Sequence, residues 1–224
     1  SKPINHFPLA DDGTKHFLMG GGIGVTPMIA FAHECHVKGL DFEFHYSASS
    51  RSSAGFLNDL KTFPWKEKVS LHFSDEHSRA NLDGILAGYQ SGWHVYTCGP
   101  DRYMSGVMEA AERQKFPDEA RHLEYFSVPE LPKYENSDFT LKLVRSGREL
   151  LIPADKTATD VLMENGIHVD MKCSDGICGV CKCGLIAGEV EHRDFVLSKK
   201  QREDSIILCQ SRAFLEGGVV EIDL

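Results

Sequence analysis

Short apolar segments alternate with helix-like segments along the first half of the chain. Strand-like patterns occur at residues 16–19, 41–46, 69–73, 93–97 and 122–126. Helical patterns at residues 27–37, 55–61 and 101–114 separate several of them. Pro27 suits the first turn of a helix, where its missing N–H group would have no partner anyway. The alternation predicts an α/β domain with a parallel sheet and helices on both faces.

The pattern changes in the second half. Residues 127–138 contain two prolines and several charges without a period, which is typical of a linker. Beyond it, residues 139–144 and 149–152 predict a hairpin, residues 159–165 a short helix, and residues 182–186, 205–208 and 219–222 further strands. This is a small α+β domain, close to the size at which a hydrophobic core alone is insufficient.

Charge and composition exclude several classes of protein. The chain has 24 Lys and Arg against 33 Asp and Glu, a net charge of −9, which argues against a nucleic-acid partner. It has no run of about 18 apolar residues, so we expect no transmembrane helix and no membrane partner. The first residue is Ser1, not Met, which predicts a piece of a longer protein. An odd number of cysteines, 7, without an export signal favours the reducing cytoplasm.

Four cysteines carry the strongest chemical signal. Cys173, Cys178 and Cys181 form C-x4-C-x2-C, and Cys209 is a distant fourth thiol, which is the plant-type [2Fe–2S] spacing. A tight loop then grips one side of the cluster and a remote strand end supplies the last thiolate. A zinc site would use two C-x2-C pairs, of which the chain has one. We interpret Cys183 as a buried thiol that is not a ligand, with ligand exchange as the alternative.

Two further motifs lie at predicted strand ends. A glycine-rich turn joins the first strand to a helix start, whose N–H groups and dipole attract a pyrophosphate, although it matches neither the Rossmann nor the P-loop pattern. Cys98, Gly99 and Pro100 directly follow the strand at residues 93–97, where ligands bind in parallel sheets. The candidate nucleotide-binding residues of the turn are Gly20, Gly21, Gly22, Gly24, Thr26 and Pro27.

Together these motifs resemble the phthalate dioxygenase reductase family, within the wider ferredoxin–NADP reductase superfamily. The resemblance rests on residues 20–28, 96–100, 189–194 and 221–224 and on the four cysteines, and it covers nearly the whole chain. It implies that Gly22, Gly24 and Thr26 contact the phosphates of a nicotinamide nucleotide. It also implies that Cys98 is the catalytic residue beside the nicotinamide, where hydride leaves, and that Gly99 and Pro100 shape that pocket.

The resemblance also implies a division of the chain. Residues 11–126 become an NAD-binding domain, 127–138 the linker, and 139–224 a plant-type [2Fe–2S] ferredoxin (β-grasp) domain. NADH releases two electrons together, whereas the cluster accepts one at a time, so a converter must lie between them, and a flavin is the usual one. The family's FMN barrel, marked by Arg-x-Tyr-Ser, does not precede Gly20 here. We therefore interpret residues 1–10 as the tail of that barrel and expect FMN in the intact protein only.

The choice between NADH and NADPH depends on the end of the second predicted strand. NADH-selective sites often place an acidic residue there, yet Tyr46 is followed by Ser-Ala-Ser-Ser and Arg51. Arg51 either binds a 2′-phosphate, stacks on adenine, or is a solvated turn charge. The family favours NADH over NADPH.

The implied function is the reductase component of a two-component Rieske-type oxygenase. Electrons pass from NADH through FMN to the [2Fe–2S] cluster and on to a terminal oxygenase that binds transiently. The alternative is a ferredoxin-like electron carrier fused to a nucleotide-sensing domain. Acidic residues near the cluster loop either steer the partner or form an ordinary solvated surface; they are Asp170, Asp175, Glu189, Glu191 and Asp194.

Overall fold

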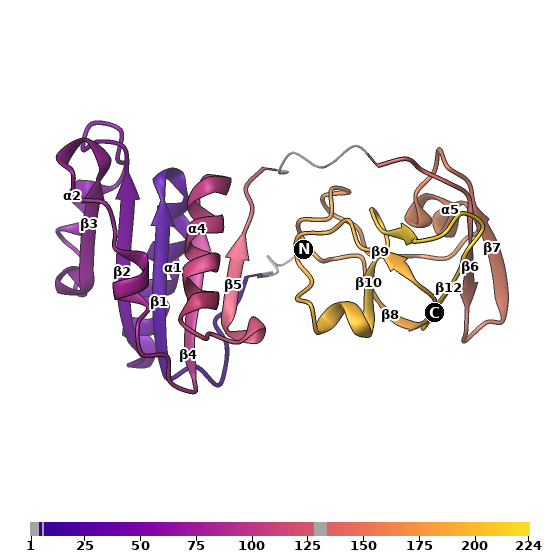
Figure 1. Cartoon of the computed structure of the whole chain (residues 1–224), viewed down its shortest axis with the longest axis horizontal. Helices are drawn as coiled ribbons and strands as arrows, with labels where there is room; N and C mark the ends of the chain where they lie inside the picture. Colours follow the sequence, from indigo (N-terminus) through magenta and orange to yellow (C-terminus); the bar gives the residue numbers. More distant parts are fainter. Residues whose placement is uncertain (1–4, 6, 128–133) are drawn as a thin grey trace. The chain divides into compact units, whose positions relative to one another are not determined.

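The computed structural model describes residues 5, 7–127 and 134–224, which fall into two compact units (Figure 1). Residues 7–127 form the α/β unit, and residues 134–224 form the β-grasp unit. The stretch predicted as a linker contains residues 128–133, which lie outside the described residues. Each unit is described here by itself.

The α/β unit is a five-stranded parallel sheet with strand order β3-β2-β1-β4-β5. This confirms the predicted sheet. The strands are β1 (Lys15–Gly21), β2 (Asp41–Ala48), β3 (Val69–Phe73), β4 (Trp93–Cys98) and β5 (Arg121–Glu124). The α-helices are α1 (Val25–Lys38), α2 (Leu57–Leu60), α3 (Leu82–Ile85) and α4 (Asp101–Arg113), and the 3₁₀ turns are η1 (Gly22–Gly24), η2 (Lys66–Lys68), η3 (Ser74–Glu76) and η4 (Asp118–Ala120).

The two long helices cover opposite faces of this sheet. Side chains of β1 alternate, so Leu18 packs with α1 while Phe17 and Met19 pack with α4. The α1 face is completed by aromatic residues of β2 and β4, including Phe44 and Tyr96. Both faces are therefore buried, as a parallel sheet requires. The strand order reverses between β1 and β4, which opens a crevice at their carboxyl ends.

Residues before β1 take part in the same core. The Phe7 ring lies 4.9 Å from that of Phe31 and 6.0 Å from that of Tyr96, centroid to centroid. Leu9 is buried, and the N–H group of Ala10 donates to the Tyr96 hydroxyl at 2.9 Å. Residues 7–10, which we interpreted as the tail of another domain, thus pack against the α/β unit.

The β-grasp unit contains a five-stranded mixed sheet with order β10-β8-β12-β6-β7. β6 and β7 form the predicted antiparallel hairpin, and β12 pairs parallel to β6. The elements are β6 (Phe139–Leu143), β7 (Arg148–Ile152), α5 (Ala158–Glu164), β8 (Lys182–Ala187), β9 (Val190–Glu191), η5 (Gln201–Glu203), β10 (Ser205–Ile207), β11 (Arg212–Ala213) and β12 (Val219–Ile222). This confirms the predicted α+β fold.

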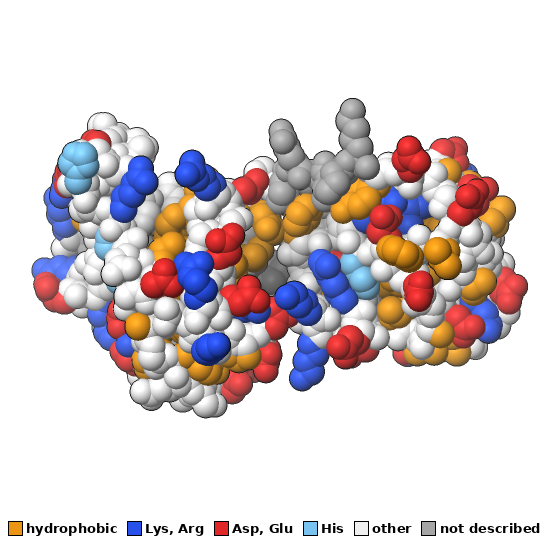
Figure 2. Space-filling model, viewed as in Figure 1, with side chains coloured by type: hydrophobic (Ala, Val, Ile, Leu, Met, Phe, Trp, Pro, Cys, Tyr) orange, Lys and Arg blue, Asp and Glu red, His pale blue; other side chains and the backbone are white. Residues whose placement is uncertain are grey.

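Helix α5 closes one face of that sheet. Thr157 begins it with a capping box, in which its hydroxyl accepts from the N–H of Asp160 and the Asp160 carboxylate accepts from the N–H of Thr157. Val161 and Leu162 then pack into the core of the unit. On the face shown in Figure 2, acidic and basic side chains of the described residues are interspersed over both units.

Candidate functional site

The glycine-rich turn and Cys98–Gly99 lie side by side at the crevice between β1 and β4. The two strands pair in parallel, with Gly20 opposite Cys98. A side chain at Gly24 would place its Cβ 2.1 Å from the carbonyl oxygen of Cys98. Gly99 has φ +154°, and a Cβ there would lie 2.8 Å from the carbonyl oxygen of Gly21. The two motifs, far apart in the sequence, are thus in backbone contact that only glycine permits.

The start of α1 is open to an anion. Neither η1 nor α1 has a side-chain cap, and neither has an acidic residue in its first turn. The Thr26 hydroxyl donates to the carbonyl of Ile23 at 3.1 Å, and Pro27 lies in the first turn of α1, as expected. Uncapped N–H groups and the positive end of the helix dipole suit a phosphate. The predicted nucleotide-binding residues of this turn therefore meet at one place.

Cys98 lies at the other wall of the crevice. Its side chain is 1% exposed and packs on the α1 face of the sheet with Tyr96 and Leu18. Burial, followed by the negative charge of Glu124, raises the pKa of the Cys98 thiol to about 12. The thiol is therefore neutral and unsuited to nucleophilic attack, and its contacts are with the core on the α1 face of the sheet.

Three hydroxyls beside the turn were not singled out by sequence reasoning. The Ser47 and Tyr103 hydroxyls are hydrogen-bonded to each other, and the buried Thr97 hydroxyl has no hydrogen-bond partner among the described residues. Ser47 is opposite Gly21 in the β1–β2 register, and a Cβ at Gly21 would lie 2.6 Å from the Tyr103 ring. A buried hydroxyl without a partner is rare, so the Thr97 hydroxyl is a group that a polar ligand could satisfy. The position of Tyr103 in the helix that follows Cys98–Gly99–Pro100 was the available signal.

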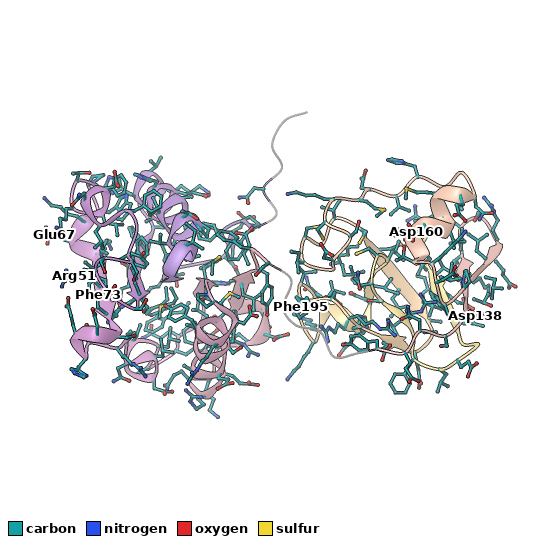
Figure 3. The ribbon with its side chains drawn as sticks, turned by 90° about the horizontal axis from the view of Figure 1, so that it is seen from above. Arg51, Glu67, Phe73, Asp138, Asp160 and Phe195 are labelled. Atoms are coloured by element: carbon teal, nitrogen blue, oxygen red, sulfur yellow. The ribbon has the colours of Figure 1, made fainter. Side chains whose placement is uncertain are left out.

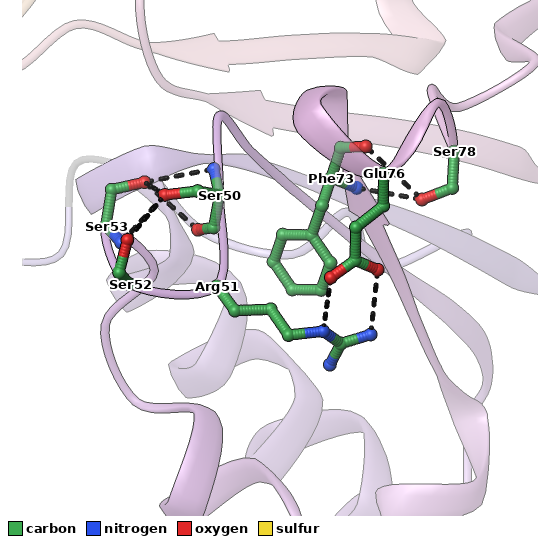
Figure 4. Close-up of polar contacts among 7 residues, drawn as sticks. All are labelled: Ser50, Arg51, Ser52, Ser53, Phe73, Glu76 and Ser78. Atoms are coloured by element: carbon green, nitrogen blue, oxygen red, sulfur yellow. Dashed lines mark hydrogen bonds and ion pairs between the residues drawn. The ribbon is translucent and has the colours of Figure 1, made fainter.

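Arg51 lies in the loop that follows β2. Its guanidinium makes two parallel hydrogen bonds to the Glu76 carboxylate, Nε to Oε1 at 2.5 Å and Nη2 to Oε2 at 3.0 Å (Figure 4). It also lies over the ring of Phe73, 4.5 Å from its centroid. Its side chain is 57% exposed, so a solvated turn charge, a 2′-phosphate ligand and an adenine stack all stay open as roles for Arg51.

The cysteine loop of the β-grasp unit precedes β8, and the fourth thiol follows β10. These two strands pair antiparallel, with Lys182 opposite Ile207. Cys181 and Cys209 therefore reach the same end of the ladder, where the N–H of Leu208 donates to the carbonyl of Cys181 at 3.3 Å. The register of a distant strand thus brings the last thiol to the loop.

The four sulfurs form two pairs. The thiol of Cys178 donates to Cys173. Burial opposes ionisation of Cys173, but this contact and the N–H of Asp175, 3.4 Å away, lower its pKa overall. The Cys209 thiol donates to Cys181 and lowers its pKa to about 6. The same contact, together with burial, raises the pKa of Cys209, on which the charge of Cys173 also acts, so the two pairs adjoin.

The loop is held in shape by its neighbours. Gly176 has φ +72°, and its carbonyl accepts from the N–H of Phe195 at 3.1 Å. The Gln210 side chain donates to the carbonyl of Ser174 at 2.7 Å. Phe195, labelled in Figure 3, follows Asp194, whose buried carboxylate accepts from two N–H groups of the next turn. Asp194 is thus structural, and its inclusion among the acidic residues that could steer a partner was wrong.

This donor set fits a two-iron cluster. Two pairs of thiols suit two irons, each with two protein ligands, and N–H groups that point at sulfur stabilise negative charge. Cys183 is in neither pair, because its thiol points to the carbonyl of Asp223, 3.9 Å away, and burial raises its pKa.

A parallel sheet with a nucleotide crevice and a β-grasp unit with paired thiols define an NAD(P)H-dependent oxidoreductase of the iron–sulfur electron-transfer class. Residues 141–214 match the 2Fe-2S iron-sulfur cluster binding domain family. The chain is 37% identical over 235 residues to the tert-butanol monooxygenase / tert-amyl alcohol desaturase reductase subunit of Aquincola tertiaricarbonis, covering 99% of this chain and 68% of that protein.

Two solved structures are similar to this chain over nearly its whole length. Phthalate dioxygenase reductase, described as a modular structure for electron transfer from pyridine nucleotides to [2Fe–2S], is 32% identical, with a TM-score of 0.58 over 100% of this chain and 70% of its own. Full-length CYP116B46 from Tepidiphilus thermophilus is 31% identical, with a TM-score of 0.83 over 98% of this chain and 29% of its own. The chain belongs to the phthalate dioxygenase reductase family, as its motifs predicted.

The matches support the expected cofactor set of a [2Fe–2S] cluster, NADH and FMN. The chain spans about two thirds of its curated relative and less than a third of the cytochrome. None of the helices in the described residues has the length and apolar character needed to cross a membrane.

Proposed function

We propose that this chain carries the nucleotide-binding and iron–sulfur parts of a cytoplasmic, NADH-dependent reductase that delivers electrons to a Rieske-type terminal oxygenase. The observation that carries this proposal is the β8–β10 register, which brings Cys209 to the end of the ladder where the cysteine loop closes at Cys181. The backbone contact between the glycine turn and Cys98–Gly99 supplies a nucleotide site to go with it.

At the nucleotide end, the chain's own residues bind and orient. The N–H groups at Gly22, Gly24 and Thr26 hold the phosphates at the start of α1. Cys98, Gly99 and Pro100 form the wall against which the nicotinamide packs. Because the Cys98 thiol is buried and neutral, it adds no charge to this wall and does not attack the ring.

At the other end, the protein supplies sulfur ligands and excludes water. Cys181 and Cys209 are buried, and the strand ladder fixes their spacing. Bound there, a [2Fe–2S] cluster accepts and releases single electrons, while FMN divides the electron pair of NADH. The loop's N–H groups and its burial set how readily the site takes up negative charge.

The partner is proposed from the relatives. Both a reductase subunit of a monooxygenase and a cytochrome P450 are similar to this chain. Asp170, Asp175 and Glu189 are exposed near the cluster loop, and they can face a basic patch on a transient partner. A short-lived encounter of this kind suits a reductase that serves its oxygenase repeatedly.

Cofactor analysis of the full-length protein, flavin segment included, tests the reductase. We expect iron and acid-labile sulfide in equal amounts, and anaerobic NADH should bleach the visible absorption. Cys209→Ser should lose the cluster absorption, whereas Cys183→Ser, a thiol outside both pairs, should keep it. Stoichiometric zinc without sulfide contradicts the proposal. A cluster that NADH does not reduce supports the nucleotide-sensing carrier instead.

Reconstitution tests the partner. The purified reductase is mixed with a Rieske-type oxygenase or with a cytochrome P450, and NADH consumption is followed with and without the oxygenase substrate. Substrate-dependent NADH consumption with the Rieske-type enzyme supports the proposal. Substrate-dependent consumption with the cytochrome P450 but not with the Rieske-type enzyme overturns the proposed partner.

A further inference from the structure

The loops after β2 and β3 form the end of the crevice where the adenosine half of a dinucleotide lies. β2 neighbours β1, and Ser47 is opposite Gly21, so the loop after β2 adjoins the phosphate site. In such sheets the ribose of the adenosine lies at the end of the second strand. Ala48 and Phe73 are in register, and the N–H of Asp75 donates to the carbonyl of Ser49 at 3.1 Å. The two loops are thus joined.

Arg51 and Glu76 face each other across these loops (Figure 4). The bidentate ion pair uses Nε and Nη2 of Arg51 and both carboxylate oxygens of Glu76. The guanidinium lies over the buried ring of Phe73 (Figure 3), which restricts its orientation. The pair is exposed, with 57% of the Arg51 side chain and 41% of the Glu76 side chain accessible. Both groups can therefore reach a bound nucleotide.

The loop around Arg51 is tied together by its serines. The Ser53 hydroxyl accepts from the N–H of Ser50 at 3.1 Å and donates to its carbonyl at 3.0 Å. On the other side, the Ser78 hydroxyl accepts from the N–H of Phe73 at 3.0 Å. Arg51 and Glu76 therefore project from two closed turns and not from extended loops.

The ion pair distinguishes the two nucleotides by charge. A 2′-phosphate brings about two negative charges next to the Glu76 carboxylate, and contact between like charges is unfavourable. A free ribose hydroxyl is neutral, donates to a carboxylate and accepts from a guanidinium. The Arg51 charge, which alone favours a phosphate, is already matched by Glu76.

We propose that the Arg51–Glu76 ion pair makes the site selective for NADH, with Glu76 as the residue that rejects the 2′-phosphate of NADPH. Glu76 supplies from the end of β3 the acidic group that is missing from the end of β2. This inference rests on the proposed NADH-dependent reductase function. Without Glu76, the free Arg51 guanidinium becomes a phosphate-binding group.

Steady-state kinetics of the full-length reductase with NADH and NADPH test this. Glu76→Gln should raise the ratio of kcat/KM for NADPH to that for NADH on the order of tenfold, mainly through a lower KM for NADPH. The double variant Glu76→Gln/Arg51→Gln should lose this gain, because the liberated guanidinium is its cause. Asp83→Asn is the matched control, since it breaks a similarly exposed bidentate pair with Arg113 elsewhere in the α/β unit.

The outcomes separate this inference from the reductase function. If wild type and variants all oxidise neither nucleotide, the proposed function fails. If all oxidise NADH normally but Glu76→Gln leaves the ratio unchanged, the selectivity inference is wrong. An equal shift in Asp83→Asn, or a gain that survives Arg51→Gln, also overturns it, because the effect would then be one of general charge.

Discussion

A cluster of two buried histidines and one partly buried histidine makes the α/β unit sensitive to mild acid. His16 and His94 are opposite each other on β1 and β4, and Nδ1 of His94 lies 2.9 Å from Nε2 of His122 on β5. The His122 ring is stacked on Tyr96, 4.5 Å between centroids. Asp12 lies 3.3 Å from His94, and the more distant carboxylates of Glu119, Asp41 and Glu34 also act on His94 or His16. Protonating this cluster places like charges in contact within a hydrophobic layer.

The size of the stability loss at low pH can be worked out from the pKa of His122. Burial, followed by the charges of His94 and His16, lowers its pKa from 6.5 to about 4. The unfolded chain therefore takes up a proton first as the pH falls through 6.5, and stability is lost from there down to about pH 4. The difference corresponds to about 2–3 kcal/mol after allowance for partial exposure. Burial lowers the pKa of His16 and His94 in the same direction.

His122→Phe keeps the ring stack on Tyr96 but cannot take up a proton. Its free energy of unfolding should fall by about 2 kcal/mol less than that of the wild type between pH 7 and pH 4.5. Urea unfolding followed by tryptophan fluorescence measures this, because both tryptophans, Trp65 and Trp93, lie in the α/β unit. His36→Phe, at an exposed position of α1, should behave as the wild type.

Two results would refute this reasoning. One is a wild-type stability that stays constant between pH 7 and pH 4.5. The other is a His122→Phe variant that loses as much stability as the wild type. The carboxylates with lowered pKa values, such as Asp41 and Asp160, lose their contributions only at lower pH, so they do not produce the same change.

Three further predictions concern single side chains. Gly24→Ala should destabilise the α/β unit by ~1–3 kcal/mol and weaken NADH binding, because the added Cβ meets the Cys98 carbonyl. Thermal unfolding and nucleotide titration measure the two effects, and Gly55→Ala, which has open space around its Cβ, should show neither. Arg212→Ala should lower the free energy of unfolding of the β-grasp unit by about 2–4 kcal/mol, since the buried guanidinium donates to the carbonyls of Ser137, Lys156 and Pro153. An unchanged midpoint in chemical unfolding would contradict this. Thr157→Ala should cost about 1 kcal/mol by removing the α5 cap, and Thr157→Ser should restore most of it.

Local patterns predicted much of the fold. The strand at residues 69–73 and that at 219–222 are observed with the predicted bounds, because period-two alternation reports directly on a half-buried strand. The helix predicted at residues 55–61 is reduced to Leu57–Leu60, because Phe56 adopts the left-handed conformation, with φ 62°, and begins the helix late. Helix α3 was not predicted, since it is a single turn capped by Asn81.

The parts of the site that could not be predicted from the sequence depend on contacts between segments far apart in the chain. The spacing of the loop cysteines is local, but which thiol pairs with Cys209 is set by the β8–β10 register. Likewise, Glu76 reaches Arg51 only because β2 and β3 lie side by side and end together. The histidine cluster draws one residue from each of three strands, so no window of the sequence contains it.

The contact of Gly24 with the Cys98–Gly99 peptide has a consequence for protein engineering. The glycine turn and the Cys98–Gly99 peptide are in direct backbone contact, so neither segment can move without displacing the other. Grafting a phosphate-binding loop from another dehydrogenase would therefore displace the Cys98–Gly99–Pro100 segment and the ligand group that packs against it. The loop and the Cys-Gly-Pro segment must therefore be exchanged together, as one cassette.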